Sequence, residues 1–222
     1  MKVIINQPFG VGDILFISPL VKSLDVEHAT WPVVDHYHWI KEYLTLPNVH
    51  FIKESEYTPA DYVDYIEVPF RHADHIVTDS MDCMSAKYQL LGADLELWRT
   101  LTFDRNKQKE QELAKLLNIE PEVEYVFVNN NFASPEYNYA ANISISSNMR
   151  VVEQQYIEGF TLLDWCGVLE KAAEVHTVST SLFFVIEALQ LAVPLHLYPR
   201  KPLDKDLSPI KTLISNKWIC HE

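Results

Sequence analysis

The sequence predicts an α/β fold made of two halves, each with a parallel sheet. Short β-branched runs alternate with helical patterns along the chain, as is typical of parallel strands joined by helices. The 222 residues are 48% apolar and 22% charged, which is enough for the core of one large or two small domains. A Glu-Pro-Glu break at 120–122 interrupts the alternation before it resumes. We therefore expect two halves that face a common cleft.

The first half, residues 1–105, is the expected acceptor-side half. We expect strands at 2–6, 30–34, 49–52 and 62–68, helices at 14–24, 36–44 and 81–91, and a helical or irregular segment at 94–102. Pro19 lies inside the first helix, where it should kink it or start a new first turn. Acids and bases alternate over 106–117, so residues 106–120 are interpreted as a solvated connecting helix.

The second half, residues 121–222, repeats the plan and is the expected donor half. We expect strands at 124–129, 150–152, 174–178 and 194–198, helices at 161–172 and 179–191, and a long polar loop at 129–142. Ligands of open parallel sheets bind beyond the carboxyl ends of the strands. The loops after Ile5, Val128, Val178 and Tyr198 should therefore line the cleft.

Composition excludes several classes of protein. The net charge is −13 and acids outnumber bases in both halves, which argues against nucleic-acid binding. The chain lacks an apolar run of about 18 residues and turns polar soon after Met1, so we expect a cytoplasmic chain without a transmembrane segment. Three widely spaced cysteines favour neither a disulfide framework nor a zinc site. The histidine pairs 36/38 and 72/75 lack a completing ligand, so no bound metal is expected.

A glycine-containing turn follows the first strand. Gly10 and Gly12 let the backbone approach a ligand closely, and the amides of the next helix favour an anion or a sugar oxygen. The third glycine of a dinucleotide-binding fingerprint is absent. Asp13 is either a helix-start acid that interacts with the helix dipole or a general base.

Three hydroxyl residues stand where a later strand becomes a very apolar helix. One of Ser179, Thr180 and Ser181 should cap that helix, and the others can donate to a phosphate. Glu187, within the same helix, needs a partner if it is buried. A ribose or sugar hydroxyl and a structural arginine or amide are both open as that partner.

Asparagines and cations supply further candidates. Asn130 and Asn131 suit either a turn or the recognition of a sugar or nucleotide, and we assign them to the donor side. The cations available to offset a diphosphate are Arg71, Lys87, Arg150, Arg200 and Lys201. Of these we assign Lys87, with Gly10 and Gly12, to the acceptor side and Arg200 to the donor side.

Two of these stretches resemble a known family. The run Gly10-Val11-Gly12-Asp13-Ile14-Leu15 and the segment 174–189 resemble the heptosyltransferase-like, family 9 glycosyltransferases, which have the GT-B architecture of two facing Rossmann-like domains. The resemblance implies that Asp13 is the catalytic base and that Thr180 and Ser181 bind the diphosphate of a nucleotide-sugar donor. It also implies an inverting, metal-independent transfer to a carbohydrate or other hydroxyl acceptor, without a cofactor.

The sequence departs from that family in two ways. It has Ser179-Thr180-Ser181 where the family usually has Asp-Thr-Gly, and it is much shorter than a full member. We therefore expect a glycosyltransferase, with two alternatives. One is a non-catalytic module that binds a nucleotide or glycan, and the other is a glycosyltransferase acting on modified DNA bases, against which the negative charge counts.

Overall fold

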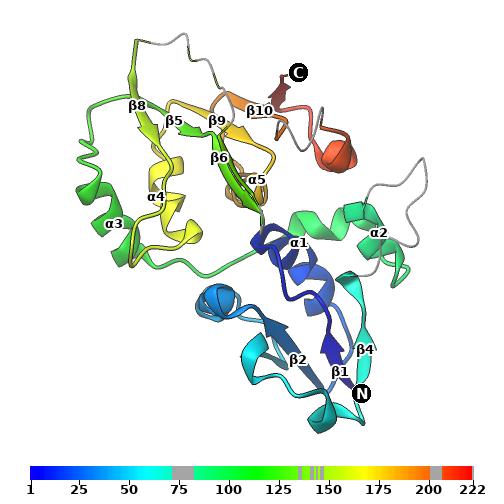
Figure 1. The fold of residues 1–222 in the computed structure, drawn as a ribbon. Helices are drawn as coiled ribbons and strands as arrows, with labels where there is room; N and C mark the ends of the chain where they lie inside the picture. The colour runs from blue at the N-terminus through cyan, green and yellow to red at the C-terminus, as the bar shows by residue number, and fades with distance from the viewer. Residues whose placement is uncertain are drawn as a thin grey trace. The chain divides into compact units, whose positions relative to one another are not determined.

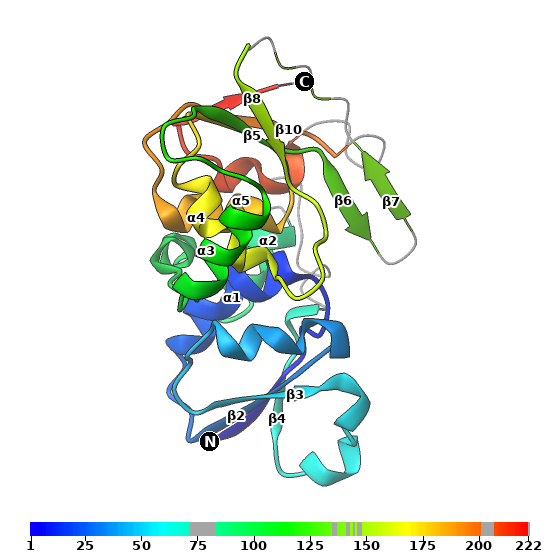
Figure 2. The same cartoon turned by 90° about the vertical axis from the view of Figure 1, so that its left-hand side faces the viewer.

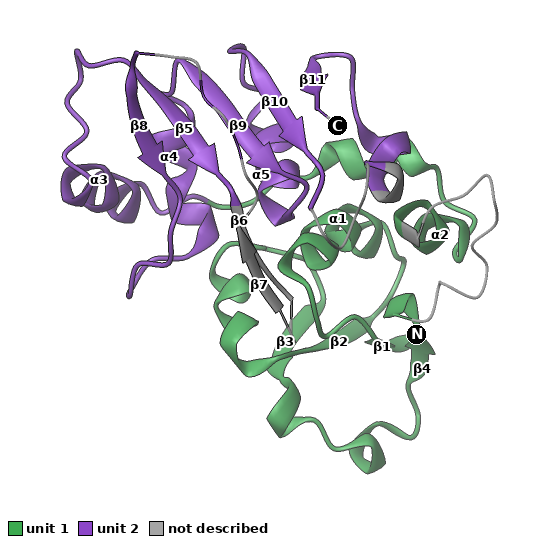
Figure 3. Cartoon of the chain, turned by 45° about the horizontal axis from the view of Figure 1, so that its top comes forward, with its two compact units in different colours: residues 1–104 green, residues 105–222 purple. Residues whose placement is uncertain are grey.

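The chain forms two compact units, Met1–Asp104 and Arg105–Glu222, which Figure 3 colours separately. The structure is a computed structural model that describes residues 1–71, 83–134, 137–140, 143, 145, 148–200 and 207–221 (Figure 1). Among the residues that the structure describes, none of the helices has both the length and the apolar character needed to span a membrane. Each unit contains its own parallel sheet.

Unit 1 has four parallel strands in the order β3-β2-β1-β4. They are β1 (Lys2–Ile5), β2 (His28–Val33), β3 (Val49–Lys53) and β4 (Ile66–Val68). The α-helices are α1 (Val11–Lys22) and α2 (Cys83–Gln89), and they pack on one another. Tyr88 of α2 donates its hydroxyl to the Phe16 carbonyl at 2.8 Å, and this contact holds α2 against α1.

Helix α1 continues through Pro19, although a proline often kinks or ends a helix. Proline has no N–H, so the Leu15 carbonyl one turn earlier loses its usual donor. The buried Ser18 hydroxyl donates to that carbonyl at 2.8 Å instead. The apolar run from Ile14 to Val21 can therefore stay helical and fully buried.

Tight helices replace several regular elements that the sequence predicts for unit 1. Asp35–Glu42 and Leu95–Thr100 are 3₁₀ helices. The strand expected over 62–68 is only Ile66–Val68, and shorter 3₁₀ helices at Glu54–Glu56 and Pro59–Tyr62 precede it.

Unit 2 has five parallel strands in the order β11-β10-β9-β5-β8. They are β5 (Tyr125–Asn129), β8 (Arg150–Glu153), β9 (Glu174–Val178), β10 (Leu195–Tyr198) and β11 (Trp218–Cys220). The helices are α3 (Lys107–Leu116), α4 (Cys166–Leu169), α5 (Ser181–Leu189) and the 3₁₀ helices Leu162–Trp165 and Ser208–Leu213. Helix α5 packs on β9 and on α4.

The prediction of one long polar loop at 129–142 is wrong. An antiparallel pair, β6 (Asn131–Ser134) and β7 (Tyr137–Ala140), occupies part of it. Strand β11 has no counterpart among the expected strands. The helix expected at 161–172 is a 3₁₀ turn followed by the four residues of α4.

Helix α3, which the sequence predicts as a solvated connection, packs beside α4 within unit 2 (Figures 1 and 2). Arg105 donates to both carboxylate oxygens of Glu110, at 2.7 and 2.6 Å, and also to Glu170. A Cβ on Gly167 of α4 would lie 2.9 Å from Glu110 Oε2. Glycine at this position therefore lets the buried ion pair fit between the two helices.

Candidate functional site

The turn between β1 and α1 requires a glycine at position 10. Gly10 has φ 75°, and its carbonyl accepts the first helical hydrogen bond, from Ile14 N–H at 3.0 Å. A Cβ on Gly10 would collide with Asp13 Oδ2. The Asp13 carboxylate thus folds back over the Gly10 backbone, in the space that a side chain would fill.

A buried lysine holds the other oxygen of that carboxylate. Lys87 Nζ lies 3.0 Å from Asp13 Oδ1 and donates to Gln7 Oε1 at 2.5 Å. The Lys87 side chain is 8% exposed, whereas that of Asp13 is 34% exposed. The carboxylate is therefore fixed from inside unit 1 and open to a ligand from outside. A carboxylate in this position can accept a proton from a bound hydroxyl.

Neighbouring contacts hold Gln7 in place. Its Nε2 donates to the Phe9 carbonyl at 2.8 Å, and its own carbonyl accepts from Trp31 Nε1 at 3.0 Å. Arg71 places its guanidinium over the Phe9 ring, 4.5 Å from the centroid. The turn therefore has an exposed cation beside it as well as the buried Lys87.

In unit 2 the turn between β9 and α5 is built from hydroxyl and amide groups. Thr180 is the N-cap of α5, and its Oγ1 accepts from Leu182 N–H at 3.4 Å. Asn129, at the end of β5, donates from Nδ2 to Thr180 Oγ1 at 3.1 Å and to Thr177 Oγ1 at 2.9 Å. The Thr180 oxygen thus accepts from two donors.

Two amide oxygens beside this turn are buried without a hydrogen-bond partner in the described structure. They are Oδ1 of Asn129 and Oδ1 of Asn130. A buried acceptor without a donor costs about 1 to 3 kcal/mol. The two acceptors are therefore the unsatisfied polar atoms of this turn among the described residues.

The remaining donor-side residues lie near the same strand ends. Ser179 N–H donates to the Tyr198 carbonyl at 2.9 Å and so joins the ends of β9 and β10. Ser181 is the first residue of α5, and Arg200 stands two residues past β10, half-buried. Asn131 begins β6, but its side chain is outside the described part of the chain, as is Lys201. On the acceptor side, Gly12 is the second residue of α1.

Glu187 does not belong to this group. Its carboxylate accepts from Trp218 Nε1 and from Ser215 Oγ at 3.3 Å, and it lies 3.4 Å from Lys217 Nζ. These partners come from β11 and the segment before it, which satisfy the buried charge. Of the partners that the sequence leaves open for Glu187, the structure shows intramolecular ones and not a ribose or sugar hydroxyl.

Sequence reasoning missed Gln7, which lies in the loop after β1 and belongs to no motif. The asparagine run at 129–131 does stand out in the sequence, where a turn and the recognition of a sugar or nucleotide are equally open interpretations. Burial raises the pKa of the Cys166 thiol to about 12, which agrees with the absence of an activated cysteine there. The side chain of Cys83 and the pair His72 and His75 fall outside the described residues.

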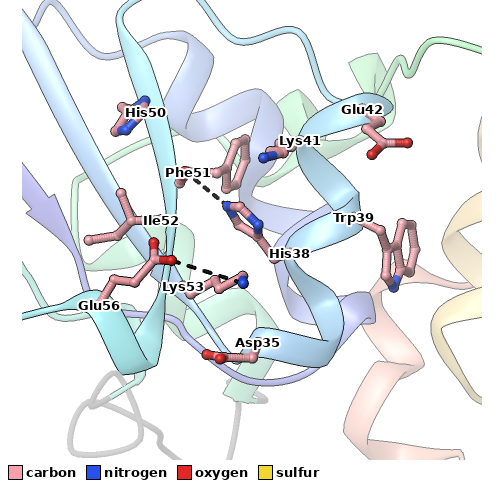
Figure 4. Close-up of a pocket in the computed structure, with 10 residues that line it drawn as sticks. All are labelled: Asp35, His38, Trp39, Lys41, Glu42, His50, Phe51, Ile52, Lys53 and Glu56. Atoms are coloured by element: carbon pink, nitrogen blue, oxygen red, sulfur yellow. Dashed lines mark hydrogen bonds and ion pairs between the residues drawn. The ribbon is translucent and has the colours of Figure 1, made fainter.

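Unit 1 also has an open cavity of about 700 Å³, separate from the Asp13 turn. Its lining includes His38, Trp39 and Lys53, and Figure 4 shows the His38 ring directed toward the Phe51 carbonyl. Hydrogen bonds from Ser55 lower the pKa of Asp35 at its edge. The lining contains both acidic and basic side chains.

No protein-family model and no curated protein sequence matches the chain. Among solved structures it is similar to a glycosyl transferase family 9 protein from Veillonella parvula, with a TM-score of 0.53 and 10% identity over 89% of this chain and 79% of that one. The chain has the fold of a family 9 glycosyltransferase. The α/β, GT-B-like fold that the sequence predicts is thereby confirmed.

Among solved structures the chain is also similar to the E. coli heptosyltransferase WaaC with ADP-2-deoxy-2-fluoro heptose. The TM-score is 0.49 and the identity 12%, over 100% of this chain and 93% of that one.

Proposed function

We propose that the chain is a glycosyltransferase that moves a sugar from a nucleotide-sugar donor to an acceptor hydroxyl. The observation that carries the proposal is the Asp13 carboxylate, held by buried Lys87 over Gly10 at the start of α1 in a family 9 fold. A partly exposed carboxylate with a fixed orientation is what a general base needs.

In the proposed reaction Asp13 takes the proton of an acceptor hydroxyl bound to unit 1. The hydroxyl oxygen forms a bond with the anomeric carbon of the donor sugar while the bond to the diphosphate breaks, so the configuration inverts. Lys87 would position the carboxylate, and Gln7 would hold Lys87 in place. A role in positioning Asp13 would explain why the charged Lys87 side chain is buried.

Unit 2 is the proposed donor half. The amino end of α5 carries the positive end of the helix dipole, and the Thr180 hydroxyl and Arg200 can add donors to a diphosphate. The unpaired Oδ1 atoms of Asn129 and Asn130 would accept from ribose, base or sugar groups. The helix N-terminus, the Thr180 hydroxyl and Arg200 would together offset the charge of the leaving nucleoside diphosphate without a metal ion.

Metal independence needs its own test because Asp204 and Asp206 stand two residues apart just after Arg200, outside the described residues. Turnover at 25 °C should be unchanged by EDTA. Loss of turnover in EDTA, restored by Mg²⁺ or Mn²⁺, would show that the leaving group needs a divalent ion.

The central experiment has two stages. First, thermal shifts with UDP, ADP, GDP, CMP and their common sugar conjugates identify the donor, and release of the nucleotide with and without sugar acceptors then measures turnover. Asp13→Asn should lower kcat by about 10²- to 10⁴-fold while donor binding stays unchanged. A donor that binds to the wild type without turnover, or a fully active Asp13→Asn variant, would favour the non-catalytic binding module or another base.

A further inference from the structure

Three metal-ligand side chains meet on the sheet of unit 2, outside both turns. Glu174 and His176 lie two residues apart on β9, so both point to the same face of the sheet. In the parallel register of β10 and β9, His196 is the partner of His176. Strand alternation and register together therefore gather one carboxylate and two imidazoles.

The three ligand atoms converge on one point. Glu174 Oε1 lies 2.8 Å from His176 Nε2 and 2.9 Å from His196 Nε2. The two imidazole rings are parallel, with centroids 4.2 Å apart and planes at 5°. All three ligand atoms lie within 4.8 Å of one another. If these atoms moved slightly apart, the space between them would admit an ion with bonds of about 2.0 to 2.2 Å.

Each imidazole is also held through its second nitrogen. His176 Nδ1 lies 3.0 Å from the Tyr198 hydroxyl, and His196 Nδ1 lies 2.9 Å from His221 Nε2. Metal-binding histidines nearly always have such a partner on the far nitrogen. A hydroxyl and an imidazole can each donate or accept, so both rings can free Nε2 for a metal by moving the proton to Nδ1, without a change of charge.

The charge and access of the cluster fit an ion. Glu174 adds one negative charge, and its side chain is 24% exposed, whereas that of His176 is 5% exposed. The cluster is therefore ordered within the sheet and open to solvent at the carboxylate.

We propose that Glu174, His176 and His196 bind one Zn²⁺ ion per chain, with water as the fourth ligand. Two imidazoles and a carboxylate are a donor set that Zn²⁺ prefers. The ion would cross-link β9 to β10 and stabilise unit 2. Glu174 begins β9 and His176 lies in its middle, whereas the proposed donor turn follows the end of that strand, so the two sites use different residues.

Calorimetric titration of the full, untagged chain with ZnCl₂ after removal of metals by EDTA tests the proposal. One Zn²⁺ should bind per chain, and His196→Asn should abolish this binding. Tyr198→Phe, which removes the partner of His176, should weaken it by about tenfold or more. His50→Asn changes an exposed histidine of unit 1 and should leave the binding unchanged.

Glu174→Gln is a second test variant, which keeps the proposal testable if His196→Asn fails to fold. Its amide oxygen can still accept from both imidazoles, so its melting temperature in EDTA should match that of the wild type, while Zn²⁺ binding weakens by at least about tenfold. The absence of saturable one-to-one binding to the wild type would overturn the proposal. Zn²⁺ binding that His196→Asn and Glu174→Gln both leave unchanged would overturn it as well, because other residues would then hold the ion.

Discussion

The turns at the starts of α1 and α5 share a backbone plan and differ in charge. Each follows a parallel strand and leads into a largely apolar helix. The first turn of α1 contains Asp13, whereas that of α5 contains no acid. In unit 1 the positive helix end is thus occupied by the chain's own carboxylate, and in unit 2 it remains available to an anion from outside.

This difference teaches how one strand-to-helix plan can serve two chemical roles. A carboxylate with a lysine partner makes the unit 1 turn suitable for proton transfer, while hydroxyl and amide groups make the unit 2 turn suitable for a phosphate. The backbone requirement differs accordingly. Gly10 has a positive φ, and Thr180 has ordinary extended backbone with φ −124°.

Among substitutions that leave Asp13 itself in place, the largest effect is expected from Gly10→Ala. The new methyl group would collide with Asp13 Oδ2, so the carboxylate must move, and a displacement of about 1 Å can lower kcat by about 100-fold. Gly92→Ala is the matched control, since Gly92 has φ 62° and no atom within 4 Å of the added Cβ. Both variants should lose similar stability, but only Gly10→Ala should lose turnover. Equal kcat values in the two variants would contradict the role of the Gly10 turn.

Lys87→Met should have the next largest effect. It removes a charge-assisted hydrogen bond worth about 1.5 to 3 kcal/mol and leaves Asp13 free to turn, so kcat should fall at least about tenfold. Donor affinity, measured by calorimetry, should not change, because Lys87 belongs to unit 1. A weakened donor with a normal kcat would place Lys87 on the donor side instead.

Thr180→Val should weaken donor binding by about fivefold through the loss of one hydrogen bond, and the lost cap should cost about 1 kcal/mol of stability. Asn106→Ala is the matched control, because Asn106 caps α3 in the same unit through Lys109 N–H. It should lose similar stability and keep the donor affinity. If the two variants bind the donor equally well, Thr180 acts only as a cap.

The smallest effect on the donor is expected from Glu187→Gln. Glu187 is tied to Trp218, Ser215 and Lys217, so the variant should melt at a lower temperature. Its donor dissociation constant should change by less than about twofold, since the intramolecular partners already satisfy the carboxylate. A large loss of donor affinity would return Glu187 to the donor site.

Local pattern was sufficient for much of the fold. Alternation of strands and helices predicted the parallel sheets, because the side-chain period of each element is visible in a short window. It was insufficient where polar residues form strands, as in β6 and β7, and where short helices are 3₁₀, as at Asp35–Glu42. Pairing and tight turns depend on contacts beyond such a window.

The sequence by itself determined the two turns, through Gly10 with Asp13 and through the hydroxyl residues before α5, since glycine and cap residues act on the backbone beside them. Tertiary structure alone decided which distant side chains complete them. It brought Lys87 to Asp13 and Asn129 to Thr180, and it gave Glu187 its partners near β11. The physical reason is that such contacts follow from strand register and helix packing, which no single segment of the chain encodes.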